Sequence, residues 1–388
     1  MRLTISSHLQ GSDQSAWLAL WESIASAHPR QHPIIAELES YRRRQPVYLG
    51  GWRGDELVAA GVFSMRRMWP GIKLEGACLR GPLFSVPDEG AEFLKNVIGW
   101  AERTRIGRLR VTPFWRHPEA AQVELMLRKI GFAAVQSRGS VSGSTGLIDL
   151  TREIGAILKG FAGSARYQIR LAERVGVSIE PSQDDDEFFA CFRSMQVENG
   201  IPAASRAEVA AMHRIFAEHP ELGIALEARL RGEFMGGLWM FRSPHCAVAT
   251  KFAVRKGKIS PEDPNLSVGP ALFWAAIQWA KASGCAVFDV DGYHPSLPPG
   301  HPCHAFCEFK KRLRPEHSLL VPEHVIVCSR VVDRIGRTSA RGQRVLTRVR
   351  MMQGARRQRN RSDAEAVRAF AASATKRDQS AAPVEAVA

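Results

Sequence analysis

The sequence of 388 residues predicts an α/β fold of two tandem domains, each a mixed sheet flanked by helices. Three observations lead to this prediction. A pattern of strand, Arg-Gly-acidic turn and strand occurs twice, and a helix that ends in Ile-x-Trp-Ala follows each copy. The chain is also longer than one hydrophobic core usually fills.

The two hairpin patterns have the same turn chemistry. The first covers residues 48–61 with its turn at Arg53-Gly54-Asp55, and the second covers 225–237 with its turn at Arg231-Gly232-Glu233. Small residues such as Gly61 and Gly236-Gly237 stand in the second strand of each, which predicts close approach by another element.

The helices that follow preserve the spacing. Arg53 and Arg231 are 178 positions apart, and Trp100 and Trp279 are 179 apart (231 minus 53, 279 minus 100). An apolar strand follows each helix, at 109–111 and 286–290, and a helix over 119–130 and a strand over 131–135 complete the first unit. We therefore interpret the chain as a duplication with domains at 1–150 and 151–328.

Composition indicates a cytoplasmic protein with anionic partners. Hydrophobic content of 45% with nine Trp can fill two cores, and no apolar run is long enough to cross a bilayer. The polar N-terminus lacks a secretory pattern, and seven scattered Cys predict reduced thiols. A net charge of +14 favours phosphate-bearing partners, nucleic acid or an acidic membrane surface.

Much of the positive charge lies in residues 329–362. The arginines of this arm follow a four-three alternation that forms one basic helix face: Arg330, Arg334, Arg337, Arg341, Arg344 and Arg348. Such a face can contact anionic lipid at the inner side of a membrane, or tRNA. Gly336 and Gly342 weaken the helix, so a solvated arm stays open as an alternative. Residues 363–388 have no core-forming pattern and are predicted to be disordered.

Three motifs occur in one order along the chain. They are Leu79-Arg80-Gly81-Pro82-Leu83; an Asp149-Leu150 strand end with the basic helix 166–177; and Phe288-Asp289-Val290-Asp291-Gly292 with Phe309-Lys310 after a Pro-rich loop. The series resembles the FemAB group of peptidoglycan-bridge aminoacyltransferases and related acetyltransferases. Here Asp291-Gly292 replaces the group's Gly-Gly, and there is no room for the long helical arm of its best-known members.

The resemblance implies two tandem GNAT (acyl-CoA N-acyltransferase) domains and an acyl-transfer enzyme. It implies that aminoacyl-tRNA or acyl-CoA donates an aminoacyl or acyl group to an amine of a nucleotide- or lipid-linked, phosphate-bearing acceptor, in cell-envelope or peptidoglycan synthesis. No tightly bound cofactor is expected. One alternative is an acyl-CoA-dependent N-acetyltransferase acting on a small amine. Another is a catalytically degenerate GNAT pair that binds nucleic acid or membrane.

The chemistry of such a transfer needs no enzyme nucleophile. An amine attacks the activated carbonyl directly, so the protein supplies positioning, a path for the amine proton and donors for the oxyanion. Consistently, the sequence contains no Gly-x-Ser-x-Gly, Walker A, Gly-x-Gly-x-x-Gly or His-Glu-x-x-His motif.

The catalytic candidates come from the last motif. The resemblance implies that Lys310 lies near the reacting centre, on a strand, where its cation stabilises the oxyanion or a tRNA phosphate. A surface lysine beside Lys311 is the alternative. Asp289 and Asp291 alternate along a strand end, so at most one faces the cleft as a base or amine-binding carboxylate.

The binding candidates are basic side chains and backbone amides. Ser267, Val268 and Gly269 precede the apolar helix 271–281, whose N-terminal amides can bind a donor phosphate, although an ordinary capped helix explains them equally. Arg166, Arg170 and Arg174 line one helix face and can bind acceptor phosphates, with a solvated face balanced by Glu173 as the alternative. The resemblance adds Arg80 to the substrate-binding residues.

A loop rich in proline contains five residues that can ligate metals: His294, His301, Cys303, His304 and Cys307. Their spacing fits no standard zinc module, so we predict a substrate-covering loop and no metal.

Overall fold

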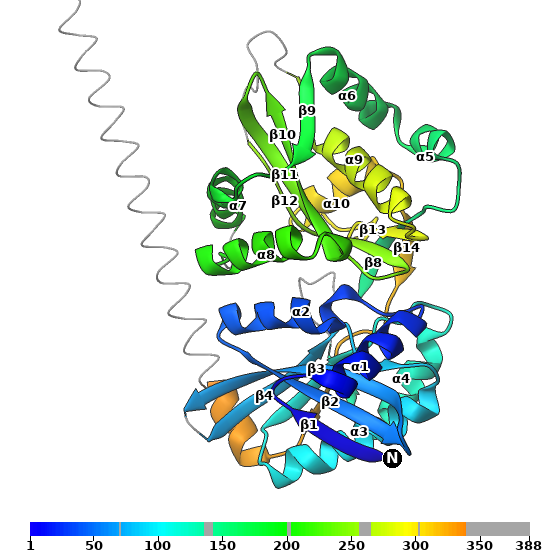
Figure 1. Cartoon of the computed structure of the whole chain (residues 1–388), viewed down its shortest axis with the longest axis vertical. Coiled ribbons are helices and arrows are strands. Elements are labelled where there is room, and N and C mark those ends of the chain that lie inside the picture. The colour runs from blue at the N-terminus through cyan, green and yellow to red at the C-terminus, as the bar shows by residue number, and fades with distance from the viewer. Residues whose placement is uncertain (70, 136–142, 200–202, 256–264, 302, 339–388) are drawn as a thin grey trace, which may run out of the picture. The chain divides into compact units, whose positions relative to one another are not determined.

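The computed structural model describes residues 1–69, 71–135, 143–199, 203–255, 265–301 and 303–338. Two mixed sheets flanked by helices organise the chain up to Arg334, which confirms the predicted fold class (Figure 1). Of the predicted basic arm, residues 339–362 lie outside the described residues, as does the predicted disordered tail 363–388. No helix in the described ranges is long and apolar enough to cross a bilayer.

The first sheet contains eight strands. Its order is β1 (Arg2–Ser6), β2 (Gln45–Arg53), β3 (Glu56–Trp69), β4 (Ile72–Leu79), β6 (Arg108–Thr112), β15 (His324–Val327) and β7 (Ala133–Ala134), and β5 (Leu83–Phe84) pairs with β3. Its helices are α1 (Gly11–Ser23), α2 (Pro33–Ala36), α3 (Pro87–Arg103) and α4 (Ala120–Lys129), with short 3₁₀ turns η1 (Pro29–Gln31) and η2 (Glu37–Arg42).

The second sheet contains seven strands. Its order is β14 (Glu316–Leu319), β8 (Ser144–Asp149), β13 (Val287–Asp289), β12 (Cys246–Val254), β11 (Glu233–Arg242), β10 (Gly223–Leu230) and β9 (Val177–Pro181). Its helices are α5 (Ile154–Gly160), α6 (Gly163–Arg174), α7 (Asp186–Glu198), α8 (Arg206–Glu218), α9 (Gly269–Ala282) and α10 (His304–Lys311), with a 3₁₀ turn η3 (Pro220–Leu222).

The two sheets repeat one plan, as the spacing of the hairpins predicted. Hairpins β2–β3 and β10–β11 turn at the two Arg-Gly sequences, where Gly54 and Gly232 have positive φ. Each sheet then contains one crossover between parallel strands, β4 to β6 and β12 to β13. Helices α3 and α9, which contain Trp100 and Trp279, make these crossovers.

Two strands pair across the predicted domain boundaries. Strand β8 ends at Asp149, within the predicted first domain, yet it pairs with β13 and β14 in the second sheet. Strand β15 pairs with β6 and β7 of the first sheet, although the boundary at 328 assigned it to the second domain. An apolar strand pattern shows that a segment is buried but does not specify its partner strand, and this explains both differences.

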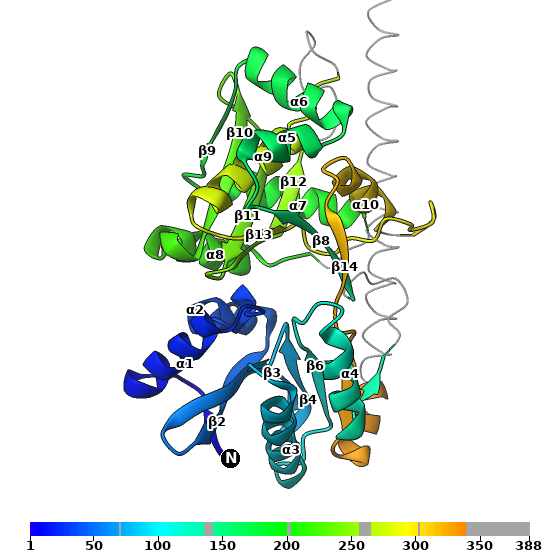
Figure 2. The ribbon, with the colours of Figure 1, turned by 90° about the vertical axis from the view of Figure 1, so that its right-hand side faces the viewer.

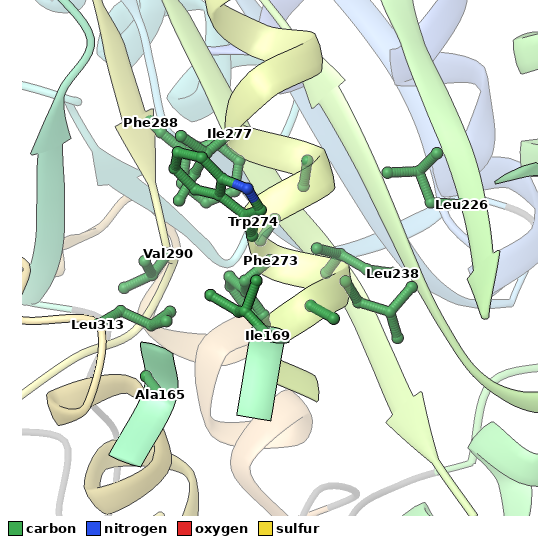
Figure 3. Close-up of a cluster of buried hydrophobic side chains, with 14 of the residues drawn as sticks. Ala165, Ile169, Leu226, Leu238, Phe273, Trp274, Ile277, Phe288, Val290 and Leu313 are labelled. Atoms are coloured by element: carbon green, nitrogen blue, oxygen red, sulfur yellow. The ribbon is translucent and has the colours of Figure 1, made fainter. Parts of the chain in front are cut away.

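Helix α9 is the centre of the second core. Figure 3 shows Phe273 and Ile277 of α9 beside Phe288 of β13, Leu238 of β11 and Ile169 of α6. These side chains are all buried, so α9, which makes the β12–β13 crossover, is packed firmly against β11 and β13. The crossover therefore has a rigid support.

The glycines of strand β11 confirm the predicted close approach. A Cβ at Gly237 would lie 2.6 Å from the Phe188 ring and 3.1 Å from the Leu226 carbonyl oxygen. The Phe188 ring itself stacks on Trp239 at 4.2 Å between centroids, which leaves it little room to move. A side chain at Gly237 therefore forces the core apart.

Gly237→Val is expected to lower the free energy of unfolding by about 1–3 kcal/mol, since an overpacked core must shift its backbone or rotamers. Urea unfolding followed by tryptophan fluorescence measures the change. The matched control is Gly155→Ala in α5, where a Cβ meets nothing within 4 Å and alanine favours the helix. Equal urea midpoints for Gly237→Val and the unsubstituted protein would contradict the packing argument.

Candidate active site

In the second sheet the two parallel strands, β12 and β13, separate from each other along their length. Strands β12 and β13 pair over only three positions, which end at Val248 opposite Asp289. Strand β12 then continues to Val254, while the segment that follows β13 turns away at Asp291, whose φ is +54°. The corresponding strands β4 and β6 of the first sheet pair over five positions. The two strands therefore separate beyond Val248, and we call the stretch of β12 that has no ladder partner from β13 the gap.

A bulge in β12 lies at this gap. Met240 of β11 pairs with Ala249 and Trp239 pairs with Lys251, so Thr250 is the extra residue. Its hydroxyl donates to the Trp239 carbonyl at 2.9 Å. A bulge leaves its extra residue outside the regular ladder and redirects the neighbouring side chains.

Asp289 is buried beneath the turn that follows β13. Its carboxyl accepts hydrogen bonds from the Thr145 hydroxyl of β8 and from the Asp291 backbone N–H, the latter at 2.7 Å. Burial, with the nearby Asp291 carboxylate, raises the pKa of Asp289. Asp289 therefore holds the turn in place, and of the two predicted carboxylates Asp291 is the one with an exposed side chain.

Asp291 joins the two sheets. Its carboxylate, 46% exposed, pairs with Arg80 Nη2 at 3.1 Å. Arg80 follows β4 of the first sheet, also has positive φ (+59°), and lies over the Phe114 ring. Its backbone N–H donates to the Thr112 hydroxyl at 2.7 Å. Two non-glycine residues in the left-handed region thus meet at one ion pair, and such strain concentrates at functional sites.

Lys310 lies on helix α10 and not on the predicted strand. Its ammonium donates to the Asp291 carbonyl and, at 3.2 Å, to the Gly292 carbonyl. Burial lowers the pKa of Lys310, and the carboxylates of Asp291 and Asp289 oppose that shift. The strand prediction was wrong because residues His304–Lys311 form a helix, which places the Phe309 ring in the second core against Gly269 and stacked on Phe252.

Four predicted residues from two separate motifs therefore meet at one turn: Arg80, Asp289, Asp291 and Lys310. Their contacts supply a half-exposed carboxylate, a guanidinium and a buried ammonium beside the gap in the second sheet. A reaction that develops negative charge on a carbonyl oxygen can use such a fixed positive field.

The sequence analysis missed a cavity of about 60 Å³ whose lining includes Leu79, the residue before Arg80, and Thr250 of the bulge. Its charged lining comes from both sheets and their helices: Arg30, Glu39, Arg42, Glu208 and Lys251. Glu208 accepts from Arg42 and Lys251, each at 2.9 Å, and Glu39 accepts from Arg42 at 3.0 Å and from Arg30 at 3.4 Å. Three cations face two carboxylates, so the lining has a net charge of +1.

Arg30 lines the cavity and lies within electrostatic range of Asp291. Burial, with the nearby Arg42, lowers the pKa of Arg30, while Glu39 and Asp291 partly offset the shift. Arg30 and Arg42 belong to no motif. The one sequence signal for the cavity is Lys251, the one charged residue of strand β12, because a buried cation requires a partner.

The predicted donor-binding residues lie at the start of α9. The Ser267 backbone N–H donates to the Gln168 side chain at 2.7 Å, so this amide already has a partner. The Val268 carbonyl accepts from the Leu272 N–H, and Gly269 lies under the Phe309 ring. Their role toward a donor stays a prediction, and for Ser267 it requires Gln168 to move.

The three arginines predicted to line α6 differ in their contacts and exposure. Arg166 donates to the carbonyls of Lys159 and Phe161 at 2.7 and 2.8 Å, so it satisfies the C-terminal end of α5. Arg170 and Arg174 are exposed. Within the described ranges, no hydrogen bond or ion pair joins these three arginines to the Asp291 turn. Their part in acceptor binding stays a prediction.

The Cys- and His-rich loop has local hydrogen bonds. His301 Nδ1 accepts from the Cys303 N–H at 3.1 Å, and His304 Nδ1 lies 2.9 Å from the Leu297 carbonyl. In the part of the chain that the structure describes, no three His, Cys, Asp or Glu side chains are grouped as metal ligands.

Asp289→Asn is expected to change how stability depends on pH. Because the folded-state pKa of Asp289 is raised, the folded protein binds more protons than the unfolded chain above the carboxyl's ordinary pKa, and stability falls as pH rises. The asparagine variant lacks this loss. Urea midpoints at about pH 4.5 and about pH 7.5 should therefore favour the variant more at the higher pH. A difference between the two proteins that is independent of pH would contradict a raised pKa.

Comparison with known proteins agrees with this architecture. A family model described as an acetyltransferase (GNAT) domain matches residues 160–294. This range includes β12, α9 and β13, the strands and helix around the gap. No protein of curated function matches the chain in sequence.

Solved structures of three other proteins align with the chain. The crystal structure of FemX aligns with a TM-score of 0.69 at 12% identity, over 84% of this chain and 97% of that one. A tandem GNAT protein from the clavulanic acid biosynthesis pathway aligns with a TM-score of 0.49 at 14% identity, over 84% and 99%. The C-terminal domain of a putative lysylphosphatidylglycerol synthetase from Agrobacterium fabrum gives 0.49 at 13%, over 84% and 96%. The chain has the tandem GNAT fold that its resemblance to the FemAB group implied.

Proposed function

We propose that this tandem GNAT protein is an acyltransferase that moves an aminoacyl group from charged tRNA to an amine of a phosphate-bearing, nucleotide- or lipid-linked acceptor. The observation that carries the proposal is the gap between β12 and β13, with Arg80, Asp291 and Lys310 at its edge. The resemblance to the FemAB group supports a role in cell-envelope synthesis, in the cytoplasm at the inner face of the membrane.

The transfer is a direct attack. The amine nitrogen forms a bond to the donor carbonyl carbon, the ester C–O bond breaks, and the amine proton must leave. Two of the three Lys310 N–H groups bond the Asp291 and Gly292 carbonyls, which leaves one for the oxyanion. Across the gap from Lys310, the Thr250 bulge places backbone groups of β12 outside the regular β11–β12 ladder.

We assign the Asp291 carboxylate as the base that accepts the amine proton. It is half-exposed and lies within the same turn as the Lys310 contacts. Arg80 holds it in one orientation from the first sheet, so the amine meets a fixed acceptor. The proton then passes to the oxygen that leaves with the tRNA.

The cavity supports an acceptor with an anionic group. Its net charge of +1 comes from Arg30, Arg42 and Lys251 against two carboxylates, and within the described residues the ion pair of Arg30 is a long contact to Glu39. A phosphate there gains charge-assisted hydrogen bonds and relieves the repulsion between Arg30 and Arg42.

Donor choice tests the proposal. The purified protein is incubated with an amine-bearing nucleotide acceptor and either aminoacyl-tRNA or acetyl-CoA, and products are identified by mass. The expected result is a product from aminoacyl-tRNA alone. The second candidate, an acyl-CoA-dependent N-acetyltransferase, is favoured by the acetyltransferase family model over 160–294 and predicts product from acetyl-CoA alone. Failure with both donors, while the protein still binds tRNA or vesicles, would indicate a degenerate GNAT pair.

A further inference from the structure

Strands β4, β6 and β15 are neighbours in the first sheet, and Figure 2 labels β4 and β6 beside each other. Leu109 and Val111 of β6 pack in the core with α3 and α4, so the alternating Arg108 and Arg110 point to the opposite face. Arg66 of β3 and Arg108 are both in register with Glu75 of β4. Two strand spacings, roughly 10 Å, therefore separate the Cα atoms of Arg66 and Arg108.

Buried carboxylates fix this layer of arginines, which we call the arginine face: Arg44, Arg66, Arg108 and Arg110. Glu75, with only 9% of its side chain exposed, accepts from Arg110 at 2.6 Å and from Arg44 at 3.5 Å. Asp333, whose side chain is 7% exposed, forms an ion pair with Arg108 Nε at 2.6 Å. The other terminal nitrogen of Arg110 pairs with Glu323 at 3.2 Å, so four arginines face three carboxylates and the layer keeps a net charge of +1.

Arg66 shows that positive charge is in excess here. Among the described residues, no carboxylate lies within ion-pair distance of its guanidinium. Burial lowers the pKa of Arg66, and Arg44, Arg108 and Arg110 add to the shift against the opposing effect of Glu75. An anion placed between these side chains removes that repulsion.

We propose that the arginine face binds the phosphate backbone of an RNA, namely the tRNA that carries the donor group. The inference rests on the proposed function, in which tRNA is the polyanion the protein must bind. Guanidinium forks held in place by buried carboxylates suit phosphates at fixed spacing. Attraction to a lipid surface needs only a cluster of positive charge near the membrane, without a fixed geometry.

Binding of uncharged tRNA to the full chain tests the inference. Fluorescence anisotropy gives Kd over a range of salt concentrations for the unsubstituted protein, Arg66→Gln and the control Arg128→Gln. In the part of the chain that the structure describes, Arg66 pairs with no carboxylate, so its variant should fold normally. Arg128 lies on α4, on the other face of the same sheet, and is 64% exposed.

Arg66→Gln should weaken tRNA binding at every salt concentration and reduce the slope of log Kd against log salt by about 0.7–0.9, the value for one phosphate contact. Arg128→Gln should change neither. Equal slopes and Kd values for Arg66→Gln and the unsubstituted protein overturn the inference. So does weaker binding of Arg66→Gln to phosphatidylglycerol vesicles with unchanged tRNA binding.

The outcomes separate this inference from the proposed function. Turnover with aminoacyl-tRNA together with unaltered tRNA binding by Arg66→Gln leaves the enzyme proposal standing and removes the arginine face from it. Turnover with acetyl-CoA alone refutes the tRNA donor, and the arginine face then loses its expected partner. Weaker tRNA binding by Arg66→Gln in a protein that uses aminoacyl-tRNA supports both.

Discussion

Lys310→Ala is expected to lower kcat/KM by about 100- to 1,000-fold, the usual cost of removing one preorganised donor to an oxyanion. The ammonium of Lys310 is buried and held by two carbonyls at the turn beside the gap, so no water replaces it without reorganisation. Lys310→Arg keeps the charge but changes its geometry, and it should recover only part of the rate. Steady-state kinetics with the donor identified above provide the measurement.

Lys311→Ala is the matched control for this variant. Lys311 is the next residue on α10, its side chain is 56% exposed, and its ion pair with Glu308 is a surface contact at 3.5 Å. It should leave kcat/KM within about twofold, since exposed pairs contribute little. Lys310→Ala also leaves two carbonyls without a donor, so urea unfolding must show that the variant is folded under assay conditions. An unchanged rate in folded Lys310→Ala would remove Lys310 from the mechanism.

Glu208→Gln is expected to lower the free energy of unfolding by about 3–5 kcal/mol at neutral pH, because it leaves the buried Lys251 ammonium without its carboxylate and removes one of the two carboxylates that pair with Arg42. Glu208 accepts from Arg42 and from Lys251, and the Glu208 and Lys251 side chains are each only 8% exposed. Urea unfolding measures the loss. Glu221→Gln, at an acidic side chain 63% exposed, is the control and should cost little.

The Glu208 effect should also depend on pH. Burial favours the protonated carboxyl, but the hydrogen bonds and charges of Arg42 and Lys251 outweigh it and lower the pKa of Glu208. A lowered folded-state pKa gives stability that is present above the ordinary pKa of the carboxyl and is lost as pH falls through the folded value. The difference between the two proteins should therefore shrink in acid. A difference that grows as pH falls would contradict the ion-pair account.

The duplicated fold could be predicted because its signals are local. The Arg53-Gly54 and Arg231-Gly232 turns and the helices with Trp100 and Trp279 each depend on a few neighbouring residues. The exchange of strands between the sheets could not be predicted in this way. Strand β15 pairs with a strand more than two hundred positions earlier, and its own pattern contains no information about that partner.

The site was predicted where a motif named the residues and missed where only packing defines them. Arg80 came from one motif and Asp291 and Lys310 from another, and the structure brings them into contact. The spacing of the α6 arginines correctly placed them on one helix, but spacing does not show that Arg166 bonds the end of α5. The charged cavity depends on Arg30 and other residues far apart in sequence, which no local pattern connects.

The central claim is that acyl transfer takes place in the gap between β12 and β13. A crystal structure with a non-hydrolysable aminoacyl-tRNA end analogue tests it most directly. The account predicts the acyl carbonyl beside Thr250, with its oxygen toward Lys310. A carbonyl bound at the β4–β6 pair of the first sheet, or anywhere outside this gap, would contradict it.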